Sequence, residues 1–139
     1  MIYLTAGPEA IRTASTWLPI LERAIDRSDG RWSREEVLDD VRNGLLLVWI
    51  MVRHERVVGV FTTRPITCRS FTWVLVEDLA GDDIDGWLPE AARALEGWAR
   101  ELGAKQIMLE GRRGWERKLR ALGYETKRIQ AVKHLVTVN

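Results

Sequence analysis

The most restrictive feature of the sequence is a long helical pattern enclosed between two strand-like segments. Apolar residues recur at helical spacing over residues 88–102, and Gly103 ends the pattern. Residues 71–77 before it and residues 106–109 after it have the composition of strands. A strand that leads through a helix into a second strand of the same sheet forms a parallel pair. The sequence therefore predicts an α/β fold with at least one parallel crossover.

The N-terminal part of the chain is predicted to contain a short strand and two helices. Residues 2–5 are β-prone, and a helical pattern follows over residues 11–25. Pro19 lies inside this pattern, where its ring and its missing N–H group disfavour an unbroken helix. The helix either splits just before Pro19 or begins near Thr16, with the proline in its first turn. A capping box at residues 33–36 starts the second helix.

An antiparallel hairpin is predicted for the middle of the chain. Residues 45–52 form a continuous apolar run, which is typical of a strand covered on both faces. The polar residues 53–56 turn the chain into a second strand at residues 57–63, which should end before Pro65. The remaining predicted elements are a helix at residues 114–122 and a β-rich tail at residues 125–138.

Composition and charge exclude several classes of protein. The chain has 21 basic and 20 acidic residues, so no global field attracts nucleic acid or an anionic membrane. No apolar stretch is long enough to span a bilayer, and no export signal precedes the first strand, which favours the cytoplasm. Cys68 is the single cysteine, and His54 and His134 lie far apart, so neither an intramolecular disulfide nor a metal site is expected. We expect one domain over residues 1–139.

The order of elements, together with one C-terminal motif, resembles the GNAT superfamily of N-acetyltransferases. The motif runs from Trp-Ala-Arg-Glu-Leu-Gly at residues 98–103 through Gly-Arg-Arg-Gly-Trp at residues 111–115 to Leu-Gly-Tyr at residues 122–124. Its Gly-Arg-x-Gly-Trp form is similar to GNAT-like proteins encoded by bacteriophages and prophages. The resemblance implies a mixed sheet of about six strands with four helices. It also implies a location in the host cytoplasm or within a virion.

The resemblance implies where acyl-coenzyme A would bind. In this family the coenzyme lies where two parallel strands splay apart, here near Leu79 and Leu109, and its pyrophosphate meets the N-terminus of the next helix. Arg112 or Arg113, across the splay, would supply positive charge. The candidate coenzyme-binding residues are Leu79, Ala80, Gly81, Gly86, Trp87 and Arg112.

The chain departs from the family pattern in its acidic loop and in its general acid. Only Gly86 fits the family's glycine-rich loop, and acids at positions 82, 83 and 85 stand where a basic loop is expected. One acid about 4 Å from a phosphate costs roughly 1 kcal/mol in water and about 4 kcal/mol at an effective dielectric of 20. A competing interpretation is that these acids cap the helix that follows. Leu119 replaces the family's proton-donating tyrosine, and Tyr124 could substitute for it by pointing into the splay.

Glu77 or Asp78 is the candidate general base, since each lies at the end of a central strand, and the sequence does not say which one faces the splay. Two functions follow from these features. The first is a phage or prophage protein with a degenerate acyl-CoA site, acting as a virion-associated or morphogenesis component. Its partner would be a protein or a second copy, through the basic residues 100–134 and the acidic residues 77–96. The alternative is an active N-acetyltransferase that uses acetyl-CoA to modify a host or phage protein or a small amine.

Overall fold

One mixed sheet organises the fold. The computed structural model describes residues 1–28, 30–111, 114–127 and 131–135. Within them the sheet has five strands in the order β1-β2-β3-β4-β5. Neighbours from β1 to β4 are antiparallel, whereas β4 and β5 are parallel, as the crossover predicted. The strands are β1 (Ile2–Thr5), β2 (Leu47–Arg53), β3 (Arg56–Cys68), β4 (Phe71–Gly81) and β5 (Gln106–Leu109).

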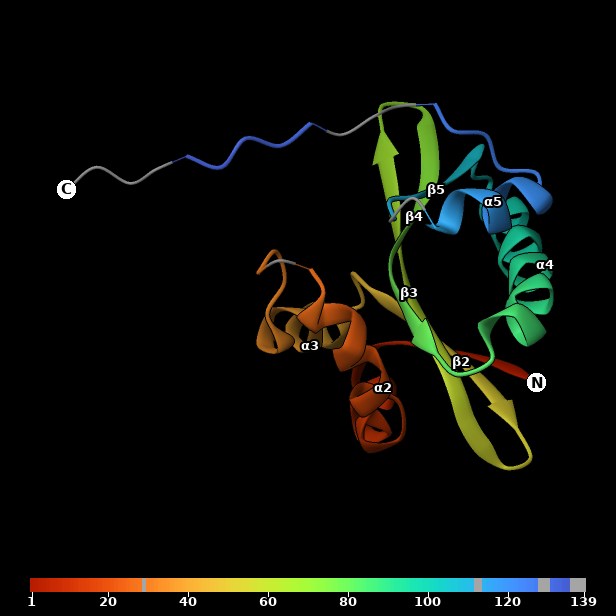
Figure 1. Cartoon of the computed structure of the whole chain (residues 1–139). Coiled ribbons are helices and arrows are strands. Elements are labelled where there is room, and N and C mark those ends of the chain that lie inside the picture. Colours follow the sequence, from red (N-terminus) through yellow and green to blue (C-terminus); the bar gives the residue numbers. More distant parts are fainter. Residues whose placement is uncertain (29, 112–113, 128–130, 136–139) are drawn as a thin grey trace.

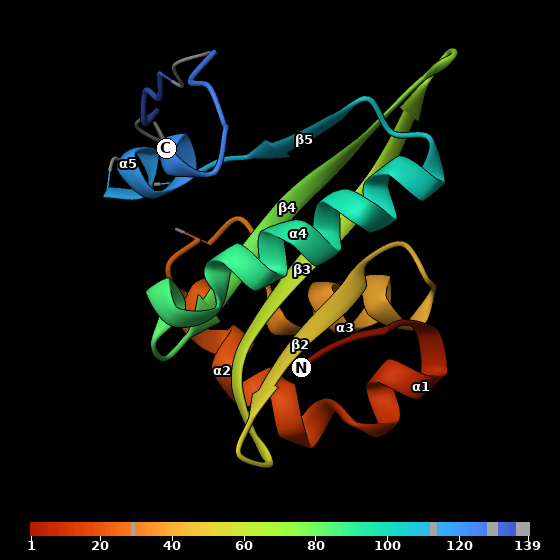
Figure 2. The same ribbon diagram turned by 90° about the vertical axis from the view of Figure 1, so that its right-hand side faces the viewer.

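Helices cover both faces of the sheet (Figure 1). Three of them lie on one face and two on the other, and Figure 2 shows α4 crossing in front of the strands with the N-terminal helices behind. This gives five helices in the described residues, where four were predicted. The first face carries α1 (Gly7–Arg12), α2 (Ala14–Asp26) and α3 (Arg34–Arg42), and the second carries α4 (Ile84–Leu102) and α5 (Gly114–Ala121).

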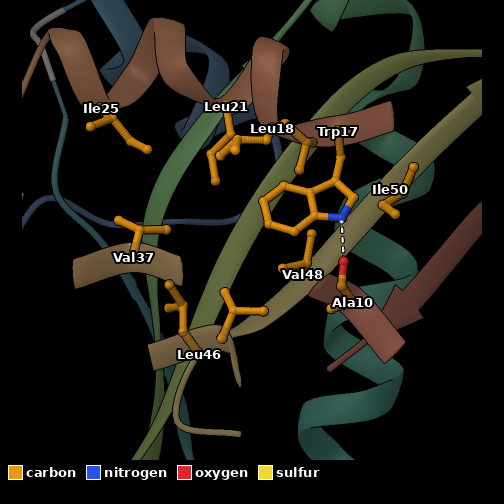
Figure 3. Packing of buried hydrophobic residues seen from close by; sticks show 11 residues of the cluster. Ala10, Trp17, Leu18, Leu21, Ile25, Val37, Leu46, Val48 and Ile50 are labelled. Carbon is orange, nitrogen blue, oxygen red and sulfur yellow. Dashed lines mark hydrogen bonds between the residues drawn. The ribbon is translucent and has the colours of Figure 1, made fainter. Parts of the chain in front are cut away.

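The core on the first face is built around Trp17 of α2 (Figure 3). Its side chain is completely buried against apolar residues of α3 and β2, including Val37 and Val48. The indole Nε1–H donates to the backbone oxygen of Ala10 at 3.1 Å. Because the polar group of the ring is satisfied inside the core, the tryptophan is buried without an unpaired donor. This contact also fixes α1 against α2.

The core on the second face lies between α4 and the central strands. Trp49 of β2 stacks on Phe61 of β3 with ring centroids 5.4 Å apart, and Trp98 of α4 packs edge-on against Trp49 at 5.5 Å. Trp87 of α4 is completely buried in the same cluster. Most tryptophans therefore serve packing, whereas Trp32 is 37% exposed.

Two predictions about proline were wrong. Pro19 neither breaks α2 nor starts it, since the chain breaks earlier, at Thr13, and α2 continues through Pro19. Pro19 and Ser15 are both exposed, so water can reach the carbonyl group that lacks a helical partner. The strand β3 does not stop before Pro65, which pairs with Val74 of β4. Pairing of β2 with β3 ends at Thr63, so Pro65 lies where β3 is an edge strand and needs no second partner.

The predicted β-rich tail is not found in the described part of the chain. Residues 125–127 and 131–135 form no strand, and the side chains of Val132 and Leu135 are 60% and 83% exposed. The capping box at α3 is confirmed, because Ser33 Oγ accepts a hydrogen bond from the Glu36 N–H at 3.1 Å. Among the helices of the described ranges, none combines the length and the apolar character needed to cross a membrane.

Candidate functional site

The central feature of the candidate site is the place where β4 and β5 separate. The two strands pair only from Trp73 and Gln106 to Val76 and Leu109. The strand β4 then continues to Gly81 with β3 as its neighbour on the other side. The edge of β4 that faces away from β3 is therefore unpaired by β5 from residue 77 onward. The predicted splay lies at this point.

A β-bulge interrupts β4 directly after its last pair with β5. Phe61 pairs with Leu79 and Thr63 pairs with Val76, so Thr62 alone stands opposite the two residues Glu77 and Asp78. The Asp78 N–H donates to Thr62 Oγ1 at 3.2 Å, which uses a buried side chain to satisfy the bulged backbone. Bulges redirect side chains and end strand pairing. Both candidate bases thus lie at the opening of the splay.

Asp78 is a buried acid with incomplete hydrogen bonding. The residue is 7% exposed, and its Oδ2 atom is buried without a hydrogen-bond partner among the described residues. Burial, and secondarily the negative charge of Glu77, raise the pKa of Asp78 to about 6. Most buried polar atoms in proteins are paired, so an unpaired carboxylate oxygen with a raised pKa is characteristic of a functional group.

Glu77 is held in a different way, by an arginine that also reaches α3. Arg64 Nε lies 2.6 Å from Glu77 Oε1, and Arg64 Nη2 lies 2.6 Å from Asp40 Oδ2. These contacts raise the pKa of Arg64, with the hydrogen bond to Glu77 as the largest cause. The Glu77 side chain is only 6% exposed. The two neighbouring acids of the bulge are therefore distinct, since in the described ranges Glu77 is paired with a cation and Asp78 is not.

A small apolar cavity lies beside the bulge, between β4, α4 and the C-terminal motif. Its volume is about 30 Å³. The residues that flank the bulge, Val76 and Leu79, form part of its wall, and Leu119 and Tyr124 close it from the opposite side. Tyr124 therefore belongs to the wall of this cavity, and its substitution for the missing tyrosine stays a prediction. Burial, and secondarily the charge of Glu96, raise the pKa of the Tyr124 hydroxyl to about 12.

The acidic loop after β4 is balanced by basic side chains from distant segments. Asp82 pairs with Arg23 of α2 at 3.0 Å. Asp85, in the first turn of α4, pairs with Lys118 of α5 at 2.8 Å. Arg53 of β2 donates to the Gly86 carbonyl oxygen at 3.1 Å. The sequence placed no base within this loop, but the fold brings three to it. The ion pairs of Asp82 and Asp85 are exposed, so they balance the negative charge of the loop only in part.

The prediction that the acids cap α4 is wrong for Asp83, which occupies the N-cap position. Its side chain makes no capping hydrogen bond, and its backbone adopts a left-handed conformation with φ of 50°. An N-cap residue normally adopts an extended conformation in order to direct its side chain at the N–H groups of the first turn. The Asp83 carboxylate instead lies against the Cα face of Gly86, where a Cβ would overlap it.

Packing accounts for the glycine at position 81 and for Trp87. Gly81 pairs with Gly59 across β3 and β4, and the Trp87 ring covers both. A Cβ at Gly81 would lie 2.5 Å from the Val58 carbonyl oxygen. The indole Nε1–H of Trp87 donates to the Asp82 carbonyl oxygen at 2.8 Å. These residues shape the start of α4, whether or not they contact a coenzyme.

The structure therefore brings most of the predicted site residues together. Leu79 lines the cavity, whereas Ala80, the next residue of β4, is buried but is not part of the cavity wall. Gly81, Gly86 and Trp87 follow along the chain, Gly86 and Trp87 in the first turn of α4. Arg112 and Arg113 lie outside the described residues. Coenzyme binding by this set stays a prediction. Three basic residues that sequence reasoning missed are Arg23, Arg53 and Lys118, which lie on elements far from the loop along the chain. In the described ranges, no group of His, Cys, Asp and Glu side chains could hold a metal ion.

Comparison with known proteins supports the fold. No protein-family model matches this sequence, and no curated protein matches it either. Solved structures match along nearly the whole chain. An aminoglycoside acetyltransferase from an uncultured soil metagenomic sample has 13% identity and a TM-score of 0.68, over 100% of this chain and 96% of its own. Glucosamine-6-phosphate N-acetyltransferase from Arabidopsis thaliana has 13% identity and a TM-score of 0.70, over 98% and 99%.

A third similar structure is the ribosomal-protein-alanine N-acetyltransferase from Brucella melitensis biovar Abortus 2308. It has 14% identity and a TM-score of 0.70, and the match covers 98% of this chain and 99% of that one. At such identities the similarity concerns the fold alone. The predicted GNAT-like fold is confirmed.

Proposed function

We propose that this chain, which has the fold of GNAT acetyltransferases, transfers an acyl group from acyl-coenzyme A to an amine. The observation that carries the proposal is Asp78, a buried acid with an unpaired oxygen at the bulge where β4 and β5 separate. Within the part of the chain that the structure describes, no ion pair balances the charge that this acid carries at neutral pH. A proton-accepting role explains why the chain keeps it.

Two parts of the splay fit acyl-coenzyme A: the free edge of β4 and the start of α4. The edge of β4 at Leu79, Ala80 and Gly81 is unpaired by β5, so its backbone groups are free to bind the amide groups of the coenzyme arm. Lys118 and Arg23 lie beside the start of α4. Each can release the aspartate with which it is paired, Asp85 or Asp82, and bind a phosphate group of the coenzyme instead. The cavity of about 30 Å³ holds about one water molecule. The side chains of Leu119 and Tyr124 must therefore move for the arm to enter.

The chemical roles follow from the two titratable groups at the splay. Bound acyl-coenzyme A supplies a thioester carbonyl that a neutral amine can attack. The pKa of Asp78 is about 6, so its carboxylate is ionised at neutral pH and is a stronger base than an exposed aspartate. The pKa of Tyr124 is about 12, so its hydroxyl keeps its proton at the same pH. As the amine nitrogen forms a bond to the acyl carbon and the carbon–sulfur bond breaks, Asp78 accepts the proton that the amine loses. The Tyr124 hydroxyl supplies a proton to the departing thiolate of coenzyme A.

Thermal unfolding with acetyl-coenzyme A tests the proposal. A ligand that binds only the folded state raises the midpoint, and a concentration about 100 times the dissociation constant adds about 2.7 kcal/mol. We expect Lys118→Ala to weaken binding about tenfold and Asp85→Asn to strengthen it, because one charge about 4 Å from a phosphate contributes at least about 1 kcal/mol. Lys105→Ala is the matched control, because Lys105 follows the opposite end of α4.

The decisive result is the wild type itself. If millimolar acetyl-coenzyme A leaves the midpoint unchanged and no acetyl group is transferred to a panel of amines, the proposal is wrong. Activity is then measured with Asp78→Asn, for which general base catalysis predicts a loss of about 100-fold or more.

A second candidate function is a non-catalytic component of a phage or prophage virion. The small cavity and Leu119 in place of a tyrosine favour it, as does the resemblance of the Gly-Arg-Arg-Gly-Trp motif to phage proteins. Its partner would be a phage or host protein or a second copy, recognised through the opposed acidic and basic segments. This candidate predicts no response to acetyl-coenzyme A, together with self-association or partner binding that weakens as salt increases.

A further inference from the structure

The bulge in β4 contains two adjacent acids, Glu77 and Asp78, and only Glu77 forms an ion pair with Arg64. Arg64 reaches Glu77 through Nε at 2.6 Å and Asp40 through Nη2 at 2.6 Å, so one guanidinium joins α3 to β4. The Arg64 side chain is 23% exposed and that of Glu77 only 6%. Asp78 makes no ion pair with Arg64, and no residue of the described ranges forms a hydrogen bond with its Oδ2 atom.

We propose that Arg64 is a positioning residue. Its ion pair with Glu77 leaves Asp78 as the carboxylate that accepts the proton of the acceptor amine. The inference rests on the proposed acyl transfer and concerns how its base is selected. Two adjacent buried carboxylates without a cation share one proton, because both cannot be charged at low cost. With Arg64 in place, Glu77 is held in an ion pair, which leaves Asp78 as the acid of the bulge that can exchange a proton with the amine.

Among the residues that the structure describes, few charged groups lie near the bulge. Arg64 approaches from β3 and Asp40 from α3, while Arg23 of α2 is paired with Asp82 further along the chain. The strand β5, Gln106–Leu109, carries no titratable side chain. Burial and the charge of Glu77 are the two causes that raise the pKa of Asp78. Arg64 therefore acts on Asp78 through Glu77.

The test follows the Asp78 carboxyl group directly, by NMR titration of the full-length chain. The wild type should show one step near pH 6. In Arg64→Met, Glu77 loses its cation and the two acids become coupled, so the Asp78 curve should broaden into two steps. In Glu77→Gln, Asp78 should titrate in one step at a lower pH than in the wild type. Asp40→Asn is the control, since it keeps the contact between Arg64 and Glu77. The Asp78 titration curve of this variant should match that of the wild type.

The rate of acetyl transfer provides the second measurement. In Arg64→Met, the rate of acetyl transfer should no longer rise with pH in a single step. Arg64→Lys keeps the positive charge and should restore part of that single step. Glu77→Gln should lose less than about tenfold in rate, whereas Asp78→Asn should lose about 100-fold or more. If Glu77→Gln is as inactive as Asp78→Asn, Glu77 is the acceptor and the inference is overturned.

The outcomes separate this inference from the proposed function. A single unchanged Asp78 step in folded Arg64→Met contradicts the role of Arg64, whatever the enzyme activity. A wild type that neither binds acetyl-coenzyme A nor transfers its acetyl group contradicts the proposed function. If Arg64→Met does not fold, Glu77→Gln carries the test alone, and an Asp78 midpoint that fails to fall refutes the coupling on which the inference depends.

Discussion

Replacing Asp78 by asparagine should stabilise the folded protein, and the gain should grow with pH. The folded-state pKa of Asp78 is about 6, against an ordinary value of 3.8. The folded protein therefore holds this proton more tightly than the unfolded chain does. The stability that Asp78 contributes is present below about pH 4 and is lost as the pH rises through about 6. An asparagine carries no charge at any of these pH values, so it avoids the loss.

The magnitude follows from the size of the pKa shift. One unit corresponds to about 1.4 kcal/mol, so the fully ionised Asp78 destabilises the folded state by about 3 kcal/mol at about pH 8. At about pH 5 the same shift costs about 1.6 kcal/mol. The difference in unfolding free energy between Asp78→Asn and the wild type should therefore increase by about 1.4 kcal/mol between these two pH values.

Urea unfolding of both proteins at the two pH values measures this increase, because the slope should be the same for both and the midpoint should shift. Any steric effect of the asparagine is present at both pH values and cancels in the comparison. Glu101→Gln, an exposed acid at the end of α4, is the control, and its effect should stay within about 0.5 kcal/mol at either pH. A difference for Asp78→Asn that is constant or shrinks as the pH rises would refute the reasoning.

Two further predictions concern stability. Gly59→Ala should cost about 1–3 kcal/mol in urea unfolding, because its Cβ would lie 2.7 Å from Cε2 of the buried Trp87 ring. Gly97→Ala, inside α4 with nothing within 4 Å of the added Cβ, should instead stabilise by about 0.5–1 kcal/mol, and a loss there would contradict the account of both glycines. Ser33→Ala should cost about 1 kcal/mol by removing the cap that accepts from the Glu36 N–H, whereas Ser33→Asp should keep most of it.

Local patterns predicted most of the fold correctly. The capping box located the start of α3, and the helical spacing that ends at Gly103 located the end of α4, where Gly103 has φ of 81°. These signals act within a few residues along the chain, so they can be recognised in a sequence. The break at Thr13 was missed because Pro19 is the stronger local signal, and its exposed position on α2 makes it tolerable there.

The candidate site was predicted less completely, because its electrostatics depend on contacts between distant residues. The sequence placed five acids near the splay, and from this we inferred an environment unfavourable to phosphate. Arg23 precedes its partner Asp82 by 59 positions, and Lys118 follows Asp85 from a different helix. Neither pair has a spacing that a sequence pattern could reveal. The positions of the acids were predictable, whereas the ion pairs that some of them form were not.

The unequal lengths of neighbouring strands explain both the misplaced end of β3 and the position of the site. The strand β2 stops pairing at Thr63, so β3 runs on as an edge strand and accepts Pro65. In the same way β5 stops pairing at Val76, and β4 runs on with one free edge through the bulge at Asp78. A free edge beside a buried acid offers backbone groups and a base to one ligand. The point where pairing ends is set by the length of the neighbouring strand. The local sequence around Pro65 or Asp78 is therefore not enough to predict that point.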